Sequence, residues 1–273
     1  MKQNTLNKTV VSVALAITLM LGVMPQKAQA VSNGTIQLGN VIGNALTTVV
    51  RGIVSGQVKS VGDALKMVAY GGAAGFGFYQ AKNLVAKGNI TSGVALANLS
   101  ASVCENVSYG QHPLAYIGYT LGFSRIRIAT PLAKNPRAIV NLEISAHDIV
   151  NTFMAVKHAD SFSFKGGLFS FSAKDAYKNN ALGWTFGPYA TTMQNAPDRV
   201  FAHEAVHVIQ NLQLAASSPY EPFLKKSGSR TAKLFAFSGL KIDALALANN
   251  MAMNAQDYES QWKEIEAYSF SGR

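Results

Sequence analysis

The spacing of apolar positions divides the chain into a helical first part and a mixed second part. Between residues 31 and 122 the sequence is rich in Gly, Ala, Ser and Val, and the segments 41–54 and 57–70 place apolar residues at helical spacing. The run at 71–75, Gly-Gly-Ala-Ala-Gly, interrupts this pattern, and we expect a break there. Because small side chains let helix backbones approach one another, residues 31–122 are predicted to form closely packed helices.

After residue 122 the apolar period changes from that of a helix to that of a strand. The segments 124–130 and 138–144 alternate apolar with polar or basic residues, which predicts two strands. Residues 161–172 contain two alternating phenylalanine-rich runs around a Lys-Gly-Gly turn, which is typical of a β-hairpin. Segment 181–192 is a further strand candidate, and helices are expected after it. The pattern predicts an α+β fold, with a small, mostly antiparallel sheet from 123–192 packed on helices.

The first thirty residues have the composition of an export signal. Lys2 and Lys8 precede an uncharged, mostly apolar run at 10–24, and residues 28–30, Ala-Gln-Ala, form a small-x-small cleavage site. We expect cleavage after about Ala30 and a periplasmic or secreted protein with no stable membrane span afterwards; a retained membrane anchor is the alternative. The predicted organisation is a signal peptide at 1–30, a helical region at 31–122 and a second domain at 123–273.

Charge and cysteine content narrow the classes of partner. The formal net charge is +10, and without the three lysines of the signal segment 21 bases remain against 14 acids, a balance of +7. The bases are scattered rather than clustered, so no nucleic-acid partner is implied. The single cysteine, Cys104, cannot form an internal disulfide, and its apolar, small-residue surroundings indicate a buried, inert thiol.

The most specific chemical signal is at residues 203–207, which read His-Glu-Ala-Val-His. Residues 195–198 read Asn-Ala-Pro-Asp and are expected to open a helix, with Asn195 as the cap, proline in the first turn and aspartate complementing the helix dipole. We expect this helix to run from Arg199 to about Leu214. An apolar stripe on another face predicts that it is largely buried: Phe201, Ala205, Val208 and Leu212.

On such a helix His203 and His207 lie one turn apart, where both imidazoles reach one ion. Glu204 lies about 100° round the helix from His203, beside that ion. Two neutral imidazoles, a third protein ligand and a water are the usual ligands of a catalytic Zn²⁺. The metal lowers the pKa of the water, and Glu204 accepts its proton. The motif therefore predicts a zinc hydrolase, with a helix carrying two solvated histidines as the alternative.

Together with a later glutamate, this motif resembles the gluzincins, which are zinc metallopeptidases of the zincin fold. Residues 264–268 read Glu-Ile-Glu-Ala-Tyr, similar to the Glu-x-Glu-Ala pattern that follows the motif in many of these enzymes. The resemblance covers residues of about 181–273 and implies a zincin-like domain at 123–273, with Glu264 as the third zinc ligand. It also places Tyr268 where the family usually has an aspartate that orients His203, and there the sequence departs from the family.

The residues themselves leave the third ligand open between Glu264 and Glu266. The two lie about 200° apart on a C-terminal helix, so only one of them is expected to reach the motif helix. No histidine follows His207, which favours a carboxylate as the third ligand. The upstream histidines are interpreted as ordinary surface or core residues: His112, His147 and His158.

The predicted activity is hydrolysis of peptide bonds in a peptide or protein substrate, as an endopeptidase. The strand candidate at 184–192 lies just before the motif helix, where zincins bind the substrate as an added strand; an ordinary core strand is the alternative. The donors considered for the developing oxyanion are Tyr268, Tyr220 and Arg230. Two other functions stay open: hydrolysis of other amides, including peptidoglycan links, and a non-catalytic exported binding or structural protein in which the zinc site is a staple or a vestige.

Overall fold

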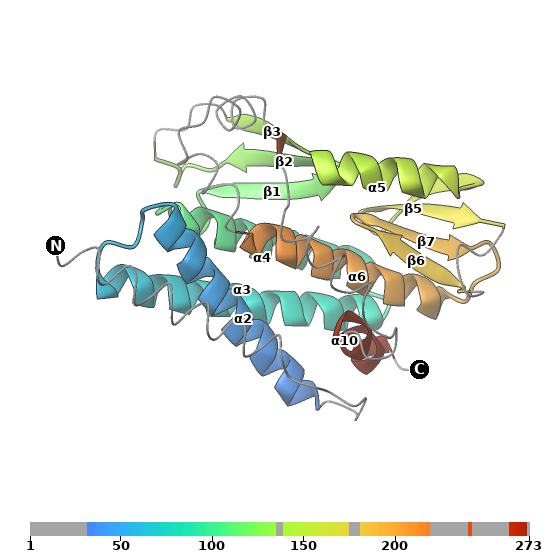
Figure 1. The fold of residues 1–273 in the computed structure, drawn as a ribbon, viewed down its shortest axis with the longest axis horizontal. Coiled ribbons are helices and arrows are strands. Elements are labelled where there is room, and N and C mark those ends of the chain that lie inside the picture. Colours follow the sequence, from blue (N-terminus) through green and yellow to red (C-terminus); the bar gives the residue numbers. More distant parts are fainter. Residues whose placement is uncertain (1–31, 135–138, 175–180, 219–239, 242–261, 272–273) are drawn as a thin grey trace.

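The computed structural model describes residues 32–134, 139–174, 181–218, 240–241 and 262–271. The expected export signal at 1–30 lies outside these residues. The helices are α2 (Asn33–Val54), α3 (Val61–Ala86), α4 (Ile90–Ser108), α5 (Ala146–Lys157), α6 (Asp198–Ser217) and α10 (Trp262–Ser271). The strands are β1 (Tyr116–Leu121), β2 (Ser124–Ala129), β3 (Val140–Ser145), β4 (Ser161–Lys165), β5 (Leu168–Ala173), β6 (Gly183–Phe186), β7 (Tyr189–Met193) and β8 (Leu240–Lys241). The fold is α+β, with a group of helices lying against two small sheets (Figure 1).

The helices α2, α3 and α4 pack against one another, as the small residues of this region predict. The predicted break at 71–75 is wrong, because α3 continues through these residues. Its glycines lie where α3 meets α2, and a Cβ on Gly75 would collide with the backbone carbonyl of Asn40. Close contact with α2 therefore requires glycine here, and it offsets the low helix propensity of that residue.

One four-stranded sheet has the order β1-β2-β3-β8, in which only the pairing of β3 with β8 is parallel. The strands β2 and β3 confirm the predictions for 124–130 and 138–144. The strand β1 corrects the expectation that 31–122 is helical throughout. The β1–β2 hairpin turns at Gly122, whose φ is 56°, so the residues on the two sides of the predicted boundary at 122 share one sheet.

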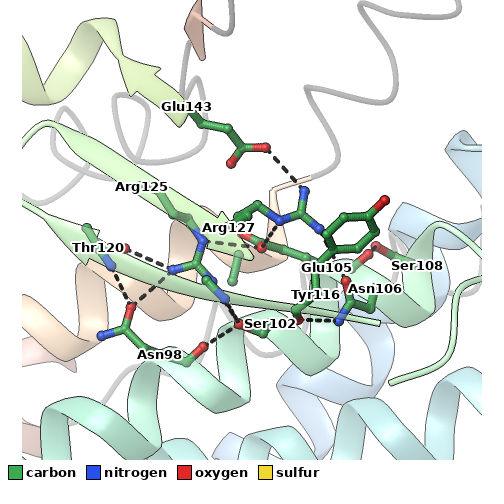
Figure 2. A network of polar contacts seen from close by, with 12 residues as sticks. Asn98, Ser102, Glu105, Asn106, Ser108, Tyr116, Thr120, Arg125, Arg127 and Glu143 are labelled. Carbon is green, nitrogen blue, oxygen red and sulfur yellow. Dashed lines mark hydrogen bonds and ion pairs between the residues drawn. The ribbon is translucent and has the colours of Figure 1, made fainter. Parts of the chain in front are cut away.

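Polar contacts join this sheet to α4 (Figure 2). The side-chain oxygen of Asn98 on α4 accepts a hydrogen bond of 2.9 Å from the backbone N–H of Thr120 in β1. Arg125 of β2 lies 3.3 Å from the carboxylate of Glu105 on α4, and both side chains are buried. A buried charge is costly unless it is paired and hydrogen-bonded. The ion pair is therefore part of what holds the sheet in place on the helix.

The other four-stranded sheet has the order β4-β5-β7-β6, so the predicted single sheet is two sheets among the described residues. The β4–β5 hairpin confirms the prediction for 161–172, and Gly166 and Gly167 form its turn with φ of 61° and 88°. Segment 181–192 is not one strand but the antiparallel pair β6 and β7. The chain reverses at Gly187, whose positive φ of 56° suits the turn. The sequence pattern did not predict α5, which follows β3 directly.

The motif helix α6 lies between α3 and α4 on one side and the strands β6 and β7 on the other, with α10 packed beside it (Figure 1). Its N-cap is Pro197, which makes no side-chain capping bond, so the expected cap at Asn195 is wrong. The apolar stripe enters the core, because Phe201, Ala205 and Val208 are buried. None of the helices in the described part of the chain is long and apolar enough to cross a membrane.

Candidate metal centre

Two helices that are distant in sequence bring together three side chains of the kinds that bind metal ions. His203 and His207 lie one turn apart on α6, and their Nε2 atoms are 3.1 Å from each other. Glu264 of α10 reaches both rings: its Oε2 lies 3.2 Å from Nε2 of His203, and its Oε1 lies 3.2 Å from Nε2 of His207. All three residues are buried. The sequence-predicted ligand set therefore meets at one point inside the protein.

The spacing of these atoms suits a metal ion. One ligand atom from each of the three residues can be chosen so that all lie within 4.8 Å of one another. Bonds of 2.0–2.1 Å in a tetrahedral site place neighbouring ligand atoms about 3.3 Å apart. The contacts of 3.1 to 3.2 Å between these residues are close to that separation. This buried group of His203, His207 and Glu264 could hold a metal ion.

Hydrogen bonds determine which nitrogen of His207 faces the cluster. The amide nitrogen of Gln210 donates to the backbone carbonyl of Lys263 at 3.0 Å and to the carboxylate of Glu266 at 2.7 Å. The amide oxygen of Gln210 must therefore face the other way, toward Nδ1 of His207 at 2.7 Å. Since an amide oxygen only accepts, Nδ1 carries the hydrogen, and Nε2 of the neutral ring keeps its lone pair for a metal.

The electrostatics of the cluster favour a cation. Burial by itself would raise the pKa of Glu264, but hydrogen bonds from His203 and His207 outweigh burial and bring this pKa to about 2. Burial would lower the pKa of His207, yet the hydrogen bond and the charge of Glu264 prevail and raise it. The carboxylate therefore stays ionised, and it attracts positive charge, whether a proton or a metal ion, to the point between the rings.

Glu204 is held beside this cluster by the edge of a sheet. The hydroxyl of Thr185 in β6 lies 2.7 Å from Oε2 of Glu204 and donates to it. A Cβ added to Gly183 would lie 2.9 Å from Cγ of Glu204, so only glycine lets the strand approach this closely. Burial raises the pKa of Glu204, although the nearby His207 and His203 partly oppose that rise. A carboxylate with a raised pKa is better suited to accept and return a proton near neutral pH.

The ring of Tyr268, one turn after Glu264 on α10, packs on the ring of His203 with centroids 4.6 Å apart. This places Tyr268 against the first histidine of the motif, where the resemblance located it. The other two oxyanion donors considered from the sequence, Tyr220 and Arg230, lie outside the described residues.

The expectation that only one glutamate reaches the motif helix is wrong. Glu264 contacts the histidines, and Glu266 contacts Gln210 on the same helix. Both can do so because α10 is embedded between α6 and α3, and Glu266 is buried like Glu264. The three upstream histidines do not join the cluster formed by the described residues: His112, His147 and His158.

Sequence reasoning missed Thr185, Gly183 and Gln210. The signal for Gln210 was present, because this residue lies three positions after His207 and thus on the same face of the helix. Thr185 and Gly183 gave no such signal, since their contact with Glu204 depends on how β6 packs against α6.

No protein-family model, curated protein or solved structure matches this chain.

Proposed function

We propose that this protein is an exported zinc-dependent peptidase of the gluzincin type with a zincin-like domain. The observation that carries the proposal is the convergence of His203, His207 and Glu264 at one buried point. The buried carboxylate of Glu204 interacts electrostatically with all three residues, and Thr185 donates a hydrogen bond to it. A structural metal site has no need of the carboxylate of Glu204. A hydrolase also needs a positioned base, and the buried, hydrogen-bonded carboxylate of Glu204 supports that role.

The donor set supports zinc as the metal. Two imidazole nitrogens and one carboxylate are the ligands of several catalytic zinc sites, which keep a fourth position open. His203, His207 and Glu264 supply this set, and their separations already suit the short bonds of zinc. When bound, the ion would lower the pKa of a water molecule and polarise a carbonyl group.

The chain's own residues would divide the remaining work. Glu204 takes a proton from the attacking water and returns it to the leaving amine, which its raised pKa favours. Thr185 holds that carboxylate in place through its hydroxyl. Gln210 fixes the ring of His207, and Tyr268 packs against the ring of His203.

The position of β6 supports a peptide as the substrate. Among the described strands, β6 is at the edge of its sheet, and Thr185 of this strand contacts Glu204. An extended peptide that pairs with such an edge gains backbone hydrogen bonds and lies along the strand. This arrangement would bring a backbone carbonyl of the substrate next to the metal and Glu204, as an endopeptidase requires.

The decisive experiment replaces Glu204 with glutamine. Glu204→Gln should keep stoichiometric zinc, as measured by elemental analysis of the purified mature protein, because Glu204 is not a ligand. Hydrolysis of a fluorescently labelled protein should fall by about 10² to 10⁴, the usual contribution of a general base. Glu143→Gln is the control, because this carboxylate pairs with Arg127 in the other sheet.

Two results would contradict the proposal. A wild-type protein that holds no stoichiometric metal would exclude both an enzymatic and a structural zinc site. A protein that binds zinc, hydrolyses no peptide or amide and melts at the same temperature as Glu204→Gln would favour the non-catalytic alternative, in which the metal only staples helices.

A further inference from the structure

A continuous chain of buried polar contacts runs from His207 to the N-terminal helices. Gln210 links His207 to Oε2 of Glu266, as described above. The other carboxylate oxygen of Glu266, Oε1, accepts hydrogen bonds from Nζ of Lys82 on α3 and from Nδ2 of Asn40 on α2, both at 2.7 Å. Four helices, α2, α3, α6 and α10, therefore meet in one hydrogen-bonded chain that ends at a proposed metal ligand.

The members of this chain are buried as deeply as the apolar core. Lys82 is 1% exposed, Gln210 is 1% exposed and Glu266 is 6% exposed. Charges in such a place are costly unless each is paired and hydrogen-bonded. Lys82 and Glu266 form an ion pair at 2.7 Å, and Asn40 also accepts a hydrogen bond from Lys82 at 2.9 Å. Replacing the pair with apolar residues would fill the same space, so its polarity needs a reason other than packing.

We propose that Lys82 and Glu266 are positioning residues of the metal centre, acting on His207 through Gln210. This inference rests on the proposed function, because it concerns the same metal site. The carboxylate of Glu266 can only accept, and it faces the amide nitrogen of Gln210, which orients the amide oxygen toward His207. Lys82 and Asn40 hold the carboxylate in that orientation from the other side. The N-terminal helices α2 and α3 thereby become part of the metal site's support.

The isosteric change Glu266→Gln tests this directly. A glutamine at 266 has one accepting end and one donating end, whereas three donors face the native carboxylate. The accepting end should turn toward the ammonium group of Lys82, because that contact is charged. The donating end then faces the donating nitrogen of Gln210, and the hold on His207 is weakened. Changes to groups that orient a metal-bound histidine typically lower metal affinity by about 10- to 100-fold.

The measurement is a titration of the full mature chain with Co²⁺, followed by its visible absorbance, and with Zn²⁺ in competition with a chromophoric chelator. Glu266→Gln and Gln210→Met should each weaken binding by about 10- to 100-fold. The double variant Gln210→Met with Glu266→Gln should bind like Gln210→Met alone, because Glu266 acts through Gln210. Additive losses in the double variant would overturn the proposed route of action.

A matched control separates positioning from the general loss of a buried ion pair. Glu105→Gln breaks the equally buried pair with Arg125, which lies between α4 and the first sheet (Figure 2). It should lower the melting temperature but leave Co²⁺ affinity unchanged, and a loss as large as that of Glu266→Gln would overturn the positioning role. If Glu266→Gln does not fold, Gln210→Met carries the test alone, because Gln210 is the only link of this route that contacts His207. Wild-type Co²⁺ affinity in Gln210→Met would overturn the positioning role.

The outcomes also separate this inference from the proposed function. A wild-type chain that binds neither Co²⁺ nor Zn²⁺ would overturn the metal site and the positioning role together. A wild-type chain that binds both ions, with Glu266→Gln binding them equally well, would overturn the positioning role alone.

Discussion

Removal of the carboxylate that lies between the two motif histidines is the sharpest test of the proposed metal centre. Glu264→Gln keeps the size of the side chain but replaces an anionic ligand with a neutral amide. Both oxygens of Glu264 face imidazole nitrogens at 3.2 Å, so the amide would also bring a donating group to one of these contacts. We expect this variant to lose most of its affinity for zinc while it keeps the fold.

The magnitude follows from the electrostatics of the site. The pKa of Glu264 lies at about 2 rather than at its ordinary value of 4.5. Such a difference corresponds to about 3 kcal/mol of preference for the charged form. A divalent cation between the same side chains should gain at least as much from that charge, so affinity should fall by about two orders of magnitude or more. Loss of a direct ligand should therefore exceed the loss caused by Glu266→Gln.

The assay is a Zn²⁺ competition titration of wild type, Glu264→Gln, Glu266→Gln and Glu143→Gln, each checked for folding by circular dichroism. Glu143 serves as the control, because it pairs with Arg127 in the first sheet. Binding by Glu264→Gln that equals wild type would refute its assignment as a ligand. A larger loss in Glu266→Gln than in Glu264→Gln would reverse the roles of the two glutamates.

Three further predictions concern the same structure. Gly183→Ala should keep zinc but slow hydrolysis by about 10²-fold, because the added Cβ would press on Val200 and on the side chain of Glu204. Gly43→Ala, with open space around its Cβ, should keep both the zinc and the wild-type rate. Zinc affinity should fall by about tenfold per pH unit as the pH drops through the raised pKa of His207, because the metal must then displace a proton from this ring. Glu264 stays ionised down to about pH 2. A zinc affinity that is constant across this range would contradict the ligand role of His207. Cys104 is buried, and burial raises the pKa of its thiol to about 11. At pH 8 this thiol should therefore react with a thiol reagent only after denaturation, and rapid reaction in the native protein would contradict its burial.

The spacing of apolar residues was sufficient to predict helices and strands that bury only one face. The β4–β5 hairpin has alternating side chains and a Gly-Gly turn, and α6 has an apolar stripe that enters the core. The prediction failed where close packing overrides propensity: Gly75 would interrupt an isolated helix, but contact with Asn40 of α2 keeps it inside α3. Similarly, Gly187 divides 181–192 into two strands because its positive φ permits a turn that the alternating pattern does not reveal.

The sequence by itself determined the chemistry that the motif offers. A spacing of four residues places His203 and His207 on one side of any helix, and Glu204 beside them, because the helix repeats every 3.6 residues. It also favoured a carboxylate as the third ligand, with Glu264 and Glu266 as the leading candidates, since no histidine follows the motif.

Only the tertiary structure showed which of those glutamates lies against the histidines. Their positions on α10 differ by about 200°, but the embedding of this helix between α6 and α3 gives both a buried partner. Glu264 meets the histidines, and Glu266 meets Gln210 and Lys82. Contacts of Glu266 join residues up to 226 positions apart, so no local pattern encodes them. They arise because buried charges are stable only where other helices supply their partners.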